Sequence, residues 1–274
     1  LRMPELPEVE TTIRYLDSKV NGKKILSIKT SKKKLRKNLH IKNFSVIEGS
    51  TIKSVDRKAK YIVLTLKPFG YLVIHLGMSG RLKFFNNKNY INEKHDHVVI
   101  EFSQFNVVLN DPRRFGMFFM LEDDQELNNF FQHYGVDLLL NSINYENIFR
   151  IFQKKNVSLK QILLDQRVFV GIGNIYANEA LFHSRLHPER KSNTLSKVEI
   201  KQLIRSCRHV LELSLKNGGS SINDYKSPDG TLGSFQNMFQ VYQRTEVILK
   251  KKRYPVKKIV QNGRSTFFSP TLQK

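Results

Sequence analysis

Residues 61–76 of this chain read YIVLTLKPFGYLVIHL, two short apolar runs separated by the turn signal Pro68-Phe69-Gly70. Tyr, Ile, Val and Thr favour strands, whereas Pro and Gly interrupt them. Similar runs recur as far as residue 121, so this part of the chain is expected to form a β-sandwich. The strands expected from the pattern are 24–30, 61–66, 71–76, 81–85, 97–102, 105–109 and 117–121.

A helix is expected before the first of these strands. Apolar residues between Leu6 and Val20 lie three or four positions apart, which is the spacing of one helical face. Pro4 precedes this pattern and Asn21-Gly22 ends it, as is typical of a helix start and a helix end. The first half of the chain therefore predicts a β-sandwich with one leading helix.

The second half of the chain, from about Glu122, has a helical period. Ser196 and Glu199 have the spacing of a capping box, and Gly218-Gly219 ends the helix that they begin. Cys207 falls on the apolar stripe of that helix. It is therefore expected to be a small buried side chain rather than a reactive thiol.

The last part of the chain changes character twice. Residues 219–235 are rich in Gly, Ser, Asp and Pro and predict a long loop. Two β-like runs at 254–260 and 264–268 meet at Asn262-Gly263, which is a strong hairpin signal. The expected domains are 1–122, 123–228 and 229–274.

Charge points to a polyanionic partner. The chain has 274 residues, with 46 Lys and Arg against 24 Asp and Glu, and a net charge of +22. Residues 19–60 hold 14 basic and 2 acidic residues, and residues 244–274 hold 9 and 1. Such stretches neutralise phosphates, although a solvated face would give the same pattern. The single cysteine excludes a disulfide framework and a four-cysteine metal site, and no apolar run approaches the ~18 residues of a membrane span.

Pro4 and Glu5 are candidates for chemistry. If Met3 is the first residue and is removed, Pro4 presents a secondary amine, which is nucleophilic when neutral. Attack on C1′ of a nucleotide would expel the base and leave an iminium, and Glu5 would donate or relay protons. The same two residues also fit a plain helix start with an acidic cap, so the local sequence leaves both interpretations open.

A series of motifs resembles, in order, those of the bacterial formamidopyrimidine-DNA glycosylases. Each motif alone is weak, but together they cover nearly the whole chain, which makes the resemblance specific. The motifs are PELPEVET at 4–11, AKY at 59–61, HLGMSG at 75–80, KHDH at 94–97, DPRRFG at 111–116, GIGNIY at 171–176, FQVY at 239–242 and NGR at 262–264.

The resemblance implies an α+β protein with an N-terminal β-sandwich and leading helix, a helical domain containing a helix–two-turn–helix motif, and a C-terminal β-hairpin. It implies a bifunctional DNA-formamidopyrimidine glycosylase and abasic-site lyase. Such an enzyme flips out and excises oxidised purines such as 8-oxoguanine and formamidopyrimidines, and then nicks the strand by β,δ-elimination. Damaged double-stranded DNA is the implied partner. We expect a cytoplasmic, nucleoid-associated monomer that does not bind membranes.

The resemblance also implies which residues are catalytic. Pro4 would be the nucleophile that forms the Schiff base, and Glu5 the general acid at the opening sugar. Lys60 would contact the phosphate beside the lesion, because a compact ammonium suits that task. Arg264 would bind a phosphate from the tip of the hairpin.

The remaining residues implied by the resemblance contact DNA. Met78, Arg113 and Phe115 would fill the space that the flipped base leaves. Asn174 would bind phosphate at a helix N-terminus, and His95 would be a further DNA contact. Each residue also has an ordinary structural interpretation: core packing for Met78 and Phe115, a surface ion pair for Arg113, a plain N-cap for Asn174, and a hydrogen-bonded sandwich histidine for His95.

The sequence departs from the family at its expected zinc finger. The family usually ends in a finger with four cysteine ligands, but no His follows His209 here and Cys207 is the only cysteine. The matching positions are Leu249, Lys252, Ser269 and Leu272. We therefore expect no metal and no other cofactor. The residues expected to pack the hairpin instead are Leu249, Val256, Ile259 and Phe268.

Residues 1–3 are a second departure. An acylated proline nitrogen is an amide without a nucleophilic lone pair, so the lyase chemistry requires Met3 to be the true start. If Pro4 stays blocked, the chain would be a catalytically silent damaged-DNA-binding protein. An endonuclease VIII-like enzyme for oxidised pyrimidines is the other alternative.

Overall fold

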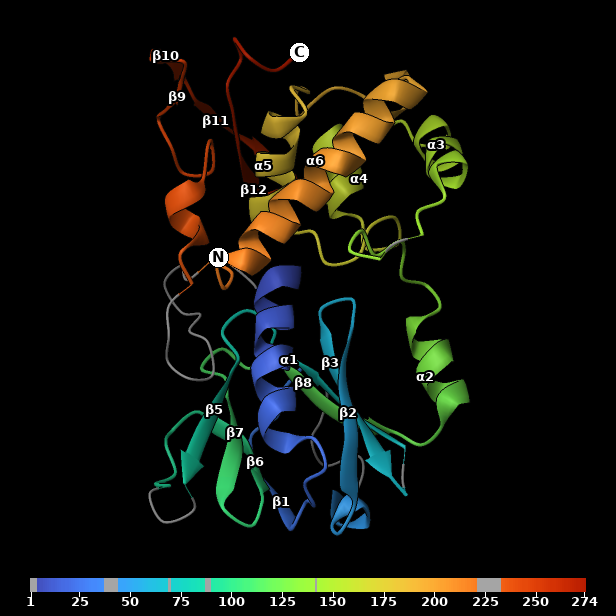
Figure 1. Cartoon of the computed structure of the whole chain (residues 1–274), viewed down its shortest axis with the longest axis vertical. Coiled ribbons are helices and arrows are strands. Elements are labelled where there is room, and N and C mark those ends of the chain that lie inside the picture. The colour runs from blue at the N-terminus through green and yellow to red at the C-terminus, as the bar shows by residue number, and fades with distance from the viewer. Residues whose placement is uncertain (1–3, 37–43, 69, 87–89, 141, 221–232) are drawn as a thin grey trace. The chain divides into compact units, whose positions relative to one another are not determined.

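The computed structural model describes residues 4–36, 44–68, 70–86, 90–140, 142–220 and 233–274 (Figure 1). They form two compact units. The N-terminal unit comprises Leu1–Gln132 with Gly218–Gly233, and the C-terminal unit comprises His133–Asn217 with Ser234–Lys274. This division rests on contacts, and the expected domains 1–122, 123–228 and 229–274 stay a prediction.

The N-terminal unit is a sandwich of two four-stranded antiparallel sheets. One sheet has the order β2-β3-β4-β8 and the other β1-β6-β7-β5. Their strands are β1 (Ser27–Thr30), β2 (Thr51–Lys58), β3 (Tyr61–Lys67), β4 (Tyr71–His75), β5 (Arg81–Asn86), β6 (Asp96–Glu101), β7 (Phe105–Asn110) and β8 (Met117–Leu121). The expected β-sandwich is thus confirmed, with most strand ends within two residues of the prediction.

Helix α1 (Leu6–Val20) closes the core of this sandwich. Its buried residues Val9, Ile13 and Leu16 belong to the same apolar cluster as residues from both sheets. Figure 1 shows α1 lying alongside β2 and β3. The apolar periodicity therefore predicted both the helix and the face that it buries.

Strand β2 was missed by the sequence analysis. Its sequence, TIKSVDRK, is mostly polar, and only Ile52 and Val55 on it are buried hydrophobic residues. The pairing with β3 shifts register between Ile52 and Ser54, which interrupts the two-residue alternation that marks a strand. Pairing with its neighbour, more than its own pattern, defines this strand.

The described residues of the C-terminal unit form four α-helices, which short segments connect. The helices are α3 (Tyr145–Lys154), α4 (Leu159–Leu164), α5 (Asn174–His183) and α6 (Lys197–Lys216), and α2 (Asp124–Phe131) belongs to the N-terminal unit. Helix α6 begins at the predicted capping box, where Ser196 accepts from the Glu199 N–H. Cys207 on α6 is 2% exposed, and burial raises the pKa of its thiol to about 12, so the thiolate form is disfavoured. One-turn 3-10 helices occur at Phe44–Ile47, Ser192–Thr194 and Phe235–Met238.

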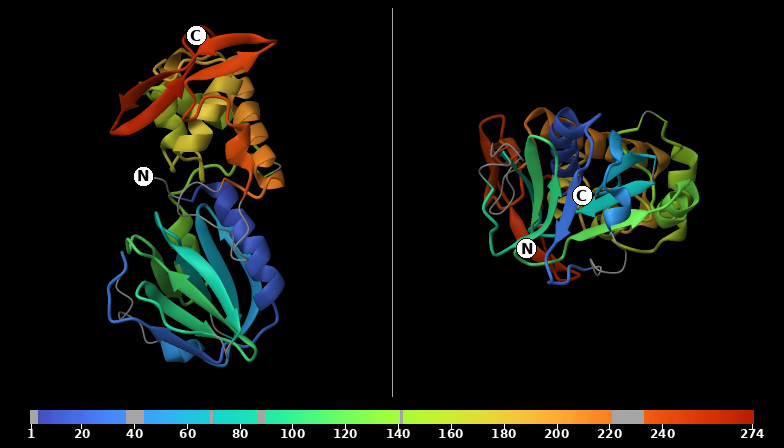
Figure 2. Two further views of the ribbon diagram at one scale, coloured as in Figure 1. Left: turned by 90° about the vertical axis from the view of Figure 1, so that its left-hand side faces the viewer. Right: turned by 90° about the horizontal axis from the view of Figure 1, so that it is seen from below.

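Two β-hairpins complete the C-terminal unit, and both are seen in the left view of Figure 2. The hairpin of β11 (Lys257–Gln261) and β12 (Arg264–Phe268) turns at Asn262-Gly263 as expected. Both turn residues have positive φ, at 48° and 72°, which is the conformation that favours Asn-Gly. The preceding hairpin of β9 (Glu246–Leu249) and β10 (Lys252–Pro255) was not predicted.

The expected packing of the C-terminal hairpins is only partly correct. Phe268 is 5% exposed, but Leu249, Val256 and Ile259 are half-buried. Phe267, at 9% exposed, packs its ring edge on Tyr242, and Phe268 packs on the ring of His187. Successive residues of a strand face opposite sides, so the burial of both Phe267 and Phe268 shows that the end of β12 is covered on both faces, whereas β11 stays partly exposed.

Two further findings concern the chain as a whole. Within the part of the chain that the structure describes, no helix has the length and apolar character of a membrane span. Most of the loop expected at 219–235 lies outside the described residues, since these stop at Ser220 and resume at Gly233.

Candidate nucleic-acid interface and catalytic residues

Pro4 and Glu5 lie at the start of α1, and both are buried. The Glu5 N–H donates to Oε2 of Glu8 at 2.9 Å, which makes Glu5 the N-cap of the helix. Oε1 of the same Glu8 accepts from the N–H and hydroxyl of Ser220, at 2.8 and 2.9 Å. Glu8 therefore joins the start of α1 to Ser220, the last described residue before 221–232.

Lys60 is in the two-residue turn between β2 and β3 and is 7% exposed. Its neighbour Ala59 has a φ of 55°, so the turn is held in the left-handed region. Arg57 ties this turn to α1: it donates to the Ala59 carbonyl at 3.2 Å and to Glu10 at 2.8 Å. The candidate lysine is thus held on the same framework as the candidate proline.

His75 lies next to Lys60 and was not given a role by the sequence analysis. It ends β4, where it pairs with Tyr61, and its ring packs at a tilt against the Tyr61 ring, with 4.6 Å between the ring centroids. Burial, and then the positive charges of Lys60 and Arg36, lower the pKa of His75 to about 4. Its Nδ1 accepts from the Gly77 N–H at 3.0 Å, which shows the neutral imidazole as an acceptor. The HLGMSG motif begins with this residue, and its position at the end of a strand was the available signal.

Met78 and the pair Arg113 and Phe115 lie on two touching loops. Gly77, beside Met78, has a φ of 64°, and a Cβ there would lie 2.4 Å from the carbonyl carbon of Phe115. Only glycine therefore allows the two backbones to approach this closely. The Arg113 guanidinium lies over the Phe115 ring at 5.3 Å, and Phe115 is 44% exposed. Core packing is thus ruled out for Phe115, and the loop of Met78 touches the loop that carries Arg113 and Phe115.

His95 lies in the turn before β6 and is half-buried. Its carbonyl accepts from the Asp111 N–H at 2.9 Å, so this turn touches the loop that carries Arg113. The hydrogen-bonded sandwich histidine is a different residue, His97, which is 1% exposed. His97 Nε2 lies 2.9 Å from the Asp111 carbonyl, and its Nδ1 lies 3.0 Å from the Ser31 hydroxyl.

Asn174 and Arg264 lie close together in the C-terminal unit. Asn174 is the first residue of α5, after the N-cap Gly173. Its Nδ2 donates at 3.0 Å to the carbonyl of Ser265, the residue that follows Arg264. Its Oδ1 is buried and has no hydrogen-bond partner among the described residues. Arg264 is exposed at the first position of β12, beside the Asn262-Gly263 tip.

Buried polar side chains hold the hairpin on the helices. Lys160 of α4 is 1% exposed, and its ammonium donates to the Ser265 carbonyl at 2.8 Å and to Oγ1 of Thr266 at 2.6 Å. Asn178 of α5 accepts from the Phe267 N–H at 2.7 Å. These contacts fix the start of β12, because they bind Ser265, Thr266 and Phe267, the three residues that follow Arg264.

Glu179 of α5 anchors the FQVY motif. Its carboxylate accepts from the N–H groups of Gln240, Val241 and Tyr242, at 2.8 to 3.0 Å. Burial raises the pKa of Glu179, and the hydrogen bonds from these three N–H groups oppose that shift. The motif that the sequence analysis noted at 239–242 is therefore a structural anchor.

A cavity of about 470 Å³ lies between α4 and the tip of the hairpin. Lys155, Lys160, Arg167 and Arg264 contribute cations to its walls, and Asp165 is an acidic group among them. Arg167, and after it Lys155, hold the pKa of Asp165 at about 2, so this carboxylate stays ionised. The excess of cations suits a phosphate group.

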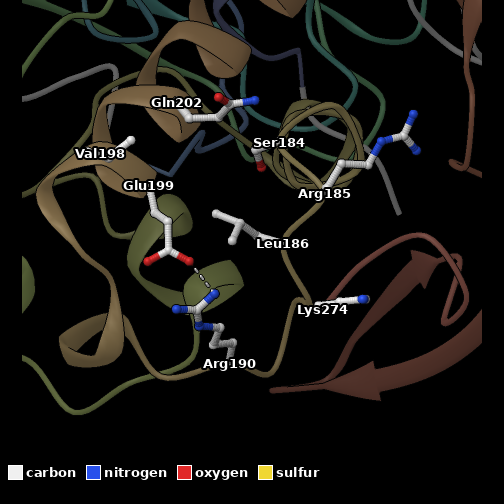
Figure 3. A pocket seen from close by; sticks show the side chains of 8 residues that line it. All are labelled: Ser184, Arg185, Leu186, Arg190, Val198, Glu199, Gln202 and Lys274. Atoms are coloured by element: carbon white, nitrogen blue, oxygen red, sulfur yellow. Dashed lines mark hydrogen bonds and ion pairs between the residues drawn. The ribbon is translucent and has the colours of Figure 1, made fainter.

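A second cavity, of about 240 Å³, is shown in Figure 3. It is lined by residues of the α5–α6 region and by Lys274, and an ion pair of 2.6 Å joins Arg190 to Glu199 in its wall. None of the candidate site residues lines it.

The residues present do not fit a zinc site. Among the residues that the structure describes, no three His, Cys, Asp or Glu side chains gather in a group that could hold a metal ion. The positions expected to match the zinc cysteines offer two leucines, a lysine and Ser269, none of which supplies a thiolate. No step of the chemistry is therefore assigned to a metal.

Comparisons with known proteins cover the whole chain. Residues 3–118 match the sequence model of the formamidopyrimidine-DNA glycosylase N-terminal domain, and residues 134–226 match that of the formamidopyrimidine-DNA glycosylase H2TH domain. The chain is 40% identical to the formamidopyrimidine-DNA glycosylase of Zymomonas mobilis over 274 residues, covering 99% of this chain and 100% of that protein. It is 36% identical to that of Wolbachia from Brugia malayi, again over 99% and 100%.

Solved structures of the Lactococcus lactis enzyme have the same fold. Its complex with abasic-site DNA is 32% identical, with a TM-score of 0.89, over 98% of this chain and 99% of that chain. Its complex with DNA that contains a formamidopyrimidine lesion is 31% identical, with a TM-score of 0.88, over 98% and 100%. On this full-length similarity, the chain belongs to the formamidopyrimidine-DNA glycosylase family.

Proposed function

We propose that this chain excises oxidised purines, such as 8-oxoguanine and formamidopyrimidines, from duplex DNA and then cuts the strand at the resulting abasic site. The observation that carries the proposal is the match of both family domains, in order, together with 40% identity over the full length of a relative named formamidopyrimidine-DNA glycosylase. Family members are bifunctional glycosylases and lyases, and the buried start of α1 supplies residues for both steps.

Pro4 is the nucleophile of the proposed reaction. With residues 1–3 absent, its secondary amine attacks C1′ of the flipped nucleotide, the bond to the base breaks, and the base leaves with the proton that the amine gives up. Glu5 protonates the ring oxygen as the sugar opens, which leaves an iminium on Pro4. Burial of both residues supports this role, because a dry site favours an amine in its neutral form.

The remaining site residues hold the DNA in this proposal. Lys60, Asn174 and Arg264 bind phosphates near the lesion, and Lys60 and Arg264 assist the elimination steps that expel the two strand ends. Met78, Arg113 and Phe115 fill the space of the flipped base, and His95 contacts the DNA nearby. Their support is the grouping of the last four on adjacent loops and the hydrogen bond that joins Asn174 to the residue after Arg264.

The roles that we propose for the three segments of the chain follow from the sequence. The sandwich at 1–122 carries the catalysis, the helices at 123–228 bind DNA, and the segment at 229–274 forms a finger without zinc. The protein acts as a monomer on chromosomal DNA in the cytoplasm, and its cationic stretches supply the affinity.

A matched pair of lesion duplexes tests the proposal. One duplex carries 8-oxoguanine opposite cytosine and the other carries thymine glycol in the same sequence context. We expect release of the oxidised purine to be much faster, with strand cleavage following. Preferred release of thymine glycol would identify an endonuclease VIII-like enzyme, and release of neither lesion would favour the catalytically silent alternative.

A further inference from the structure

We propose that Asp111 is a positioning residue that holds the void-filling side chains Met78, Arg113 and Phe115, together with His95, on one preformed platform. The proposal rests on the proposed function, because it assigns those side chains to the space left by a flipped base. It extends that function to a residue that does not itself touch DNA. Asp111 is fully buried at the start of the DPRRFG loop.

The Asp111 carboxylate joins the Met78 loop to the Phe115 loop. One oxygen accepts from the Ser79 hydroxyl at 2.5 Å, and the other accepts from the Gly116 N–H at 2.8 Å. The Ser79 oxygen in turn accepts from the Arg113 N–H at 3.1 Å. One side chain therefore sets the backbone beside each of the three void-filling residues.

The Asp111 backbone extends the network to His95. Its N–H donates to the His95 carbonyl at 2.9 Å, and its carbonyl accepts from the Arg114 N–H at 3.3 Å. The Arg114 φ of 59° shows that the loop bends sharply there. Since His97 also contacts the Asp111 carbonyl, the platform is fixed to the core of the β-sandwich.

The space around the carboxylate leaves it little freedom. A Cβ on Gly116 would lie 3.0 Å from an Asp111 carboxylate oxygen and 3.0 Å from the His75 carbonyl. A buried carboxylate is costly unless it is fully hydrogen-bonded, so a carboxylate at this position requires both loops in place. Conversely, the Ser79 hydroxyl and the Gly116 N–H both need an acceptor at this position, and an apolar side chain offers none.

Such a platform lowers the cost of filling the vacated stack. An exposed Phe and an Arg would otherwise lose side-chain and loop freedom when they insert into DNA. With Asp111 in place, the two loops are already ordered in the free protein, before DNA binds. Its loss should then weaken steps that need void filling and spare steps that do not.

Asp111→Ala and Asp111→Asn test the proposal, with Ile100→Ala as a control for stability. Ile100 is a core residue of β6, 3% exposed, and it pairs with Ile28 and Val107 near the end of the strand away from His95. The Asn variant can still accept from Gly116 and donate to Ser79, so it should restore most of what Ala removes.

Two measurements on the full chain need no chemistry. Hydrogen exchange in the free protein should show lost protection at 77–80 and 113–116 in Asp111→Ala, but not in Ile100→Ala. With a duplex carrying a tetrahydrofuran abasic analogue opposite 2-aminopurine, the fluorescence change on binding reports insertion at the orphaned base. We expect Asp111→Ala to need about tenfold more protein for that change, since two buried donors lose their acceptor.

A third measurement separates this inference from the proposed function. Single-stranded abasic DNA has no base stack to fill. The rate at which Asp111→Ala cleaves it should therefore stay within about twofold of the parent rate, well below a tenfold change, which corresponds to 1.4 kcal/mol. Unchanged exchange and fluorescence in Asp111→Ala would overturn the inference. Equal losses on single-stranded and duplex DNA, matched by Ile100→Ala, would overturn it as well. Failure of the parent chain to cleave abasic DNA would instead count against the proposed function, and the exchange result would still decide whether Asp111 orders the loops.

Discussion

His75 illustrates how single residues shape this site. Its imidazole is buried beside the ammonium of Lys60, and the two cannot both be charged without strong repulsion. The protein therefore keeps His75 neutral, as an acceptor for the Gly77 N–H that begins the Met78 loop. A neutral histidine adds polarity to the site without adding a further charge.

The depressed pKa of His75 makes stability depend on pH. The folded pKa of about 4 lies below the ordinary value of 6.5, so the unfolded chain binds a proton more readily between these values. The stability that His75 contributes is present above pH 6.5 and is lost as pH falls toward 4, by about 3 kcal/mol in total. In His75→Asn, which keeps an acceptor for Gly77, denaturant unfolding should show a smaller loss over this window.

The exposed His133 supplies the control for that prediction. His133→Asn should leave the pH dependence of unfolding as it is in the parent chain. If His75→Asn also leaves it unchanged, a depressed pKa of His75 is not a source of acid sensitivity.

At the scale of elements, the hairpin of β11 and β12 is held by polar side chains from two helices. Lys160 of α4 binds the Ser265 carbonyl and the Thr266 hydroxyl, and Asn178 of α5 binds the Phe267 N–H. All of these contacts lie within three residues of Arg264, so the helices set the position of that arginine.

Replacing Lys160 by Met tests this anchor. Met has a similar length but no donor, so Thr266 loses its charged partner and the unfolding free energy should fall by about 1–3 kcal/mol. DNA binding at fixed salt should weaken as well, because Arg264 is no longer held. Lys257→Met, an exposed change on the same hairpin, removes the same charge and should alter stability by less than about 0.5 kcal/mol. Equal effects of the two variants would contradict the anchoring role.

The hairpin is also where a zinc finger is expected in the family. A structural zinc contributes folding energy directly. In this chain the buried Phe267 and Phe268 and the hydrogen bonds from Lys160 stabilise the hairpin. We expect substoichiometric zinc in metal analysis of the purified protein, and no change in thermal unfolding on addition of a chelator. One zinc per chain, lost together with stability on chelation, would contradict this expectation.

Elements differ in how far the sequence could predict them. Helix α1, strand β8 and the Asn262-Gly263 turn have strong local signals and were predicted with nearly correct ends. Strand β2 was missed because its residues are mostly polar and its pairing is decided by its neighbour. The hairpin of β9 and β10 was missed because each strand has only four residues, too few for a clear alternating pattern. His75 and Asp111 could be quoted as parts of motifs, but their contacts depend on loops brought together only by the fold.

For the molecule as a whole, the net charge of +22 predicts salt-sensitive DNA binding. Each phosphate contact contributes about 0.9 to the slope of log K against log salt on duplex DNA. Arg264→Ala should therefore weaken binding similarly for different sequences and reduce the slope by about one contact. Binding measured from low to moderate salt checks this.

Arg205 is exposed on α6 and is not among the proposed phosphate-binding residues, so Arg205→Ala is the control for the loss of one surface charge. An Arg264→Ala slope equal to that of the parent chain would remove Arg264 from the phosphate-binding residues. The same would follow if Arg205→Ala changed the slope as much.

The most direct test of the account is borohydride trapping on abasic and 8-oxoguanine duplexes, followed by mapping of the cross-linked peptide. Pro4 as nucleophile predicts a covalent protein–DNA adduct at the Pro4 nitrogen, loss of most trapping in Pro4→Gly, and Pro as the first residue in N-terminal sequencing of the native protein. An adduct that maps to a lysine, or no adduct from protein whose first residue is Leu1, would contradict it.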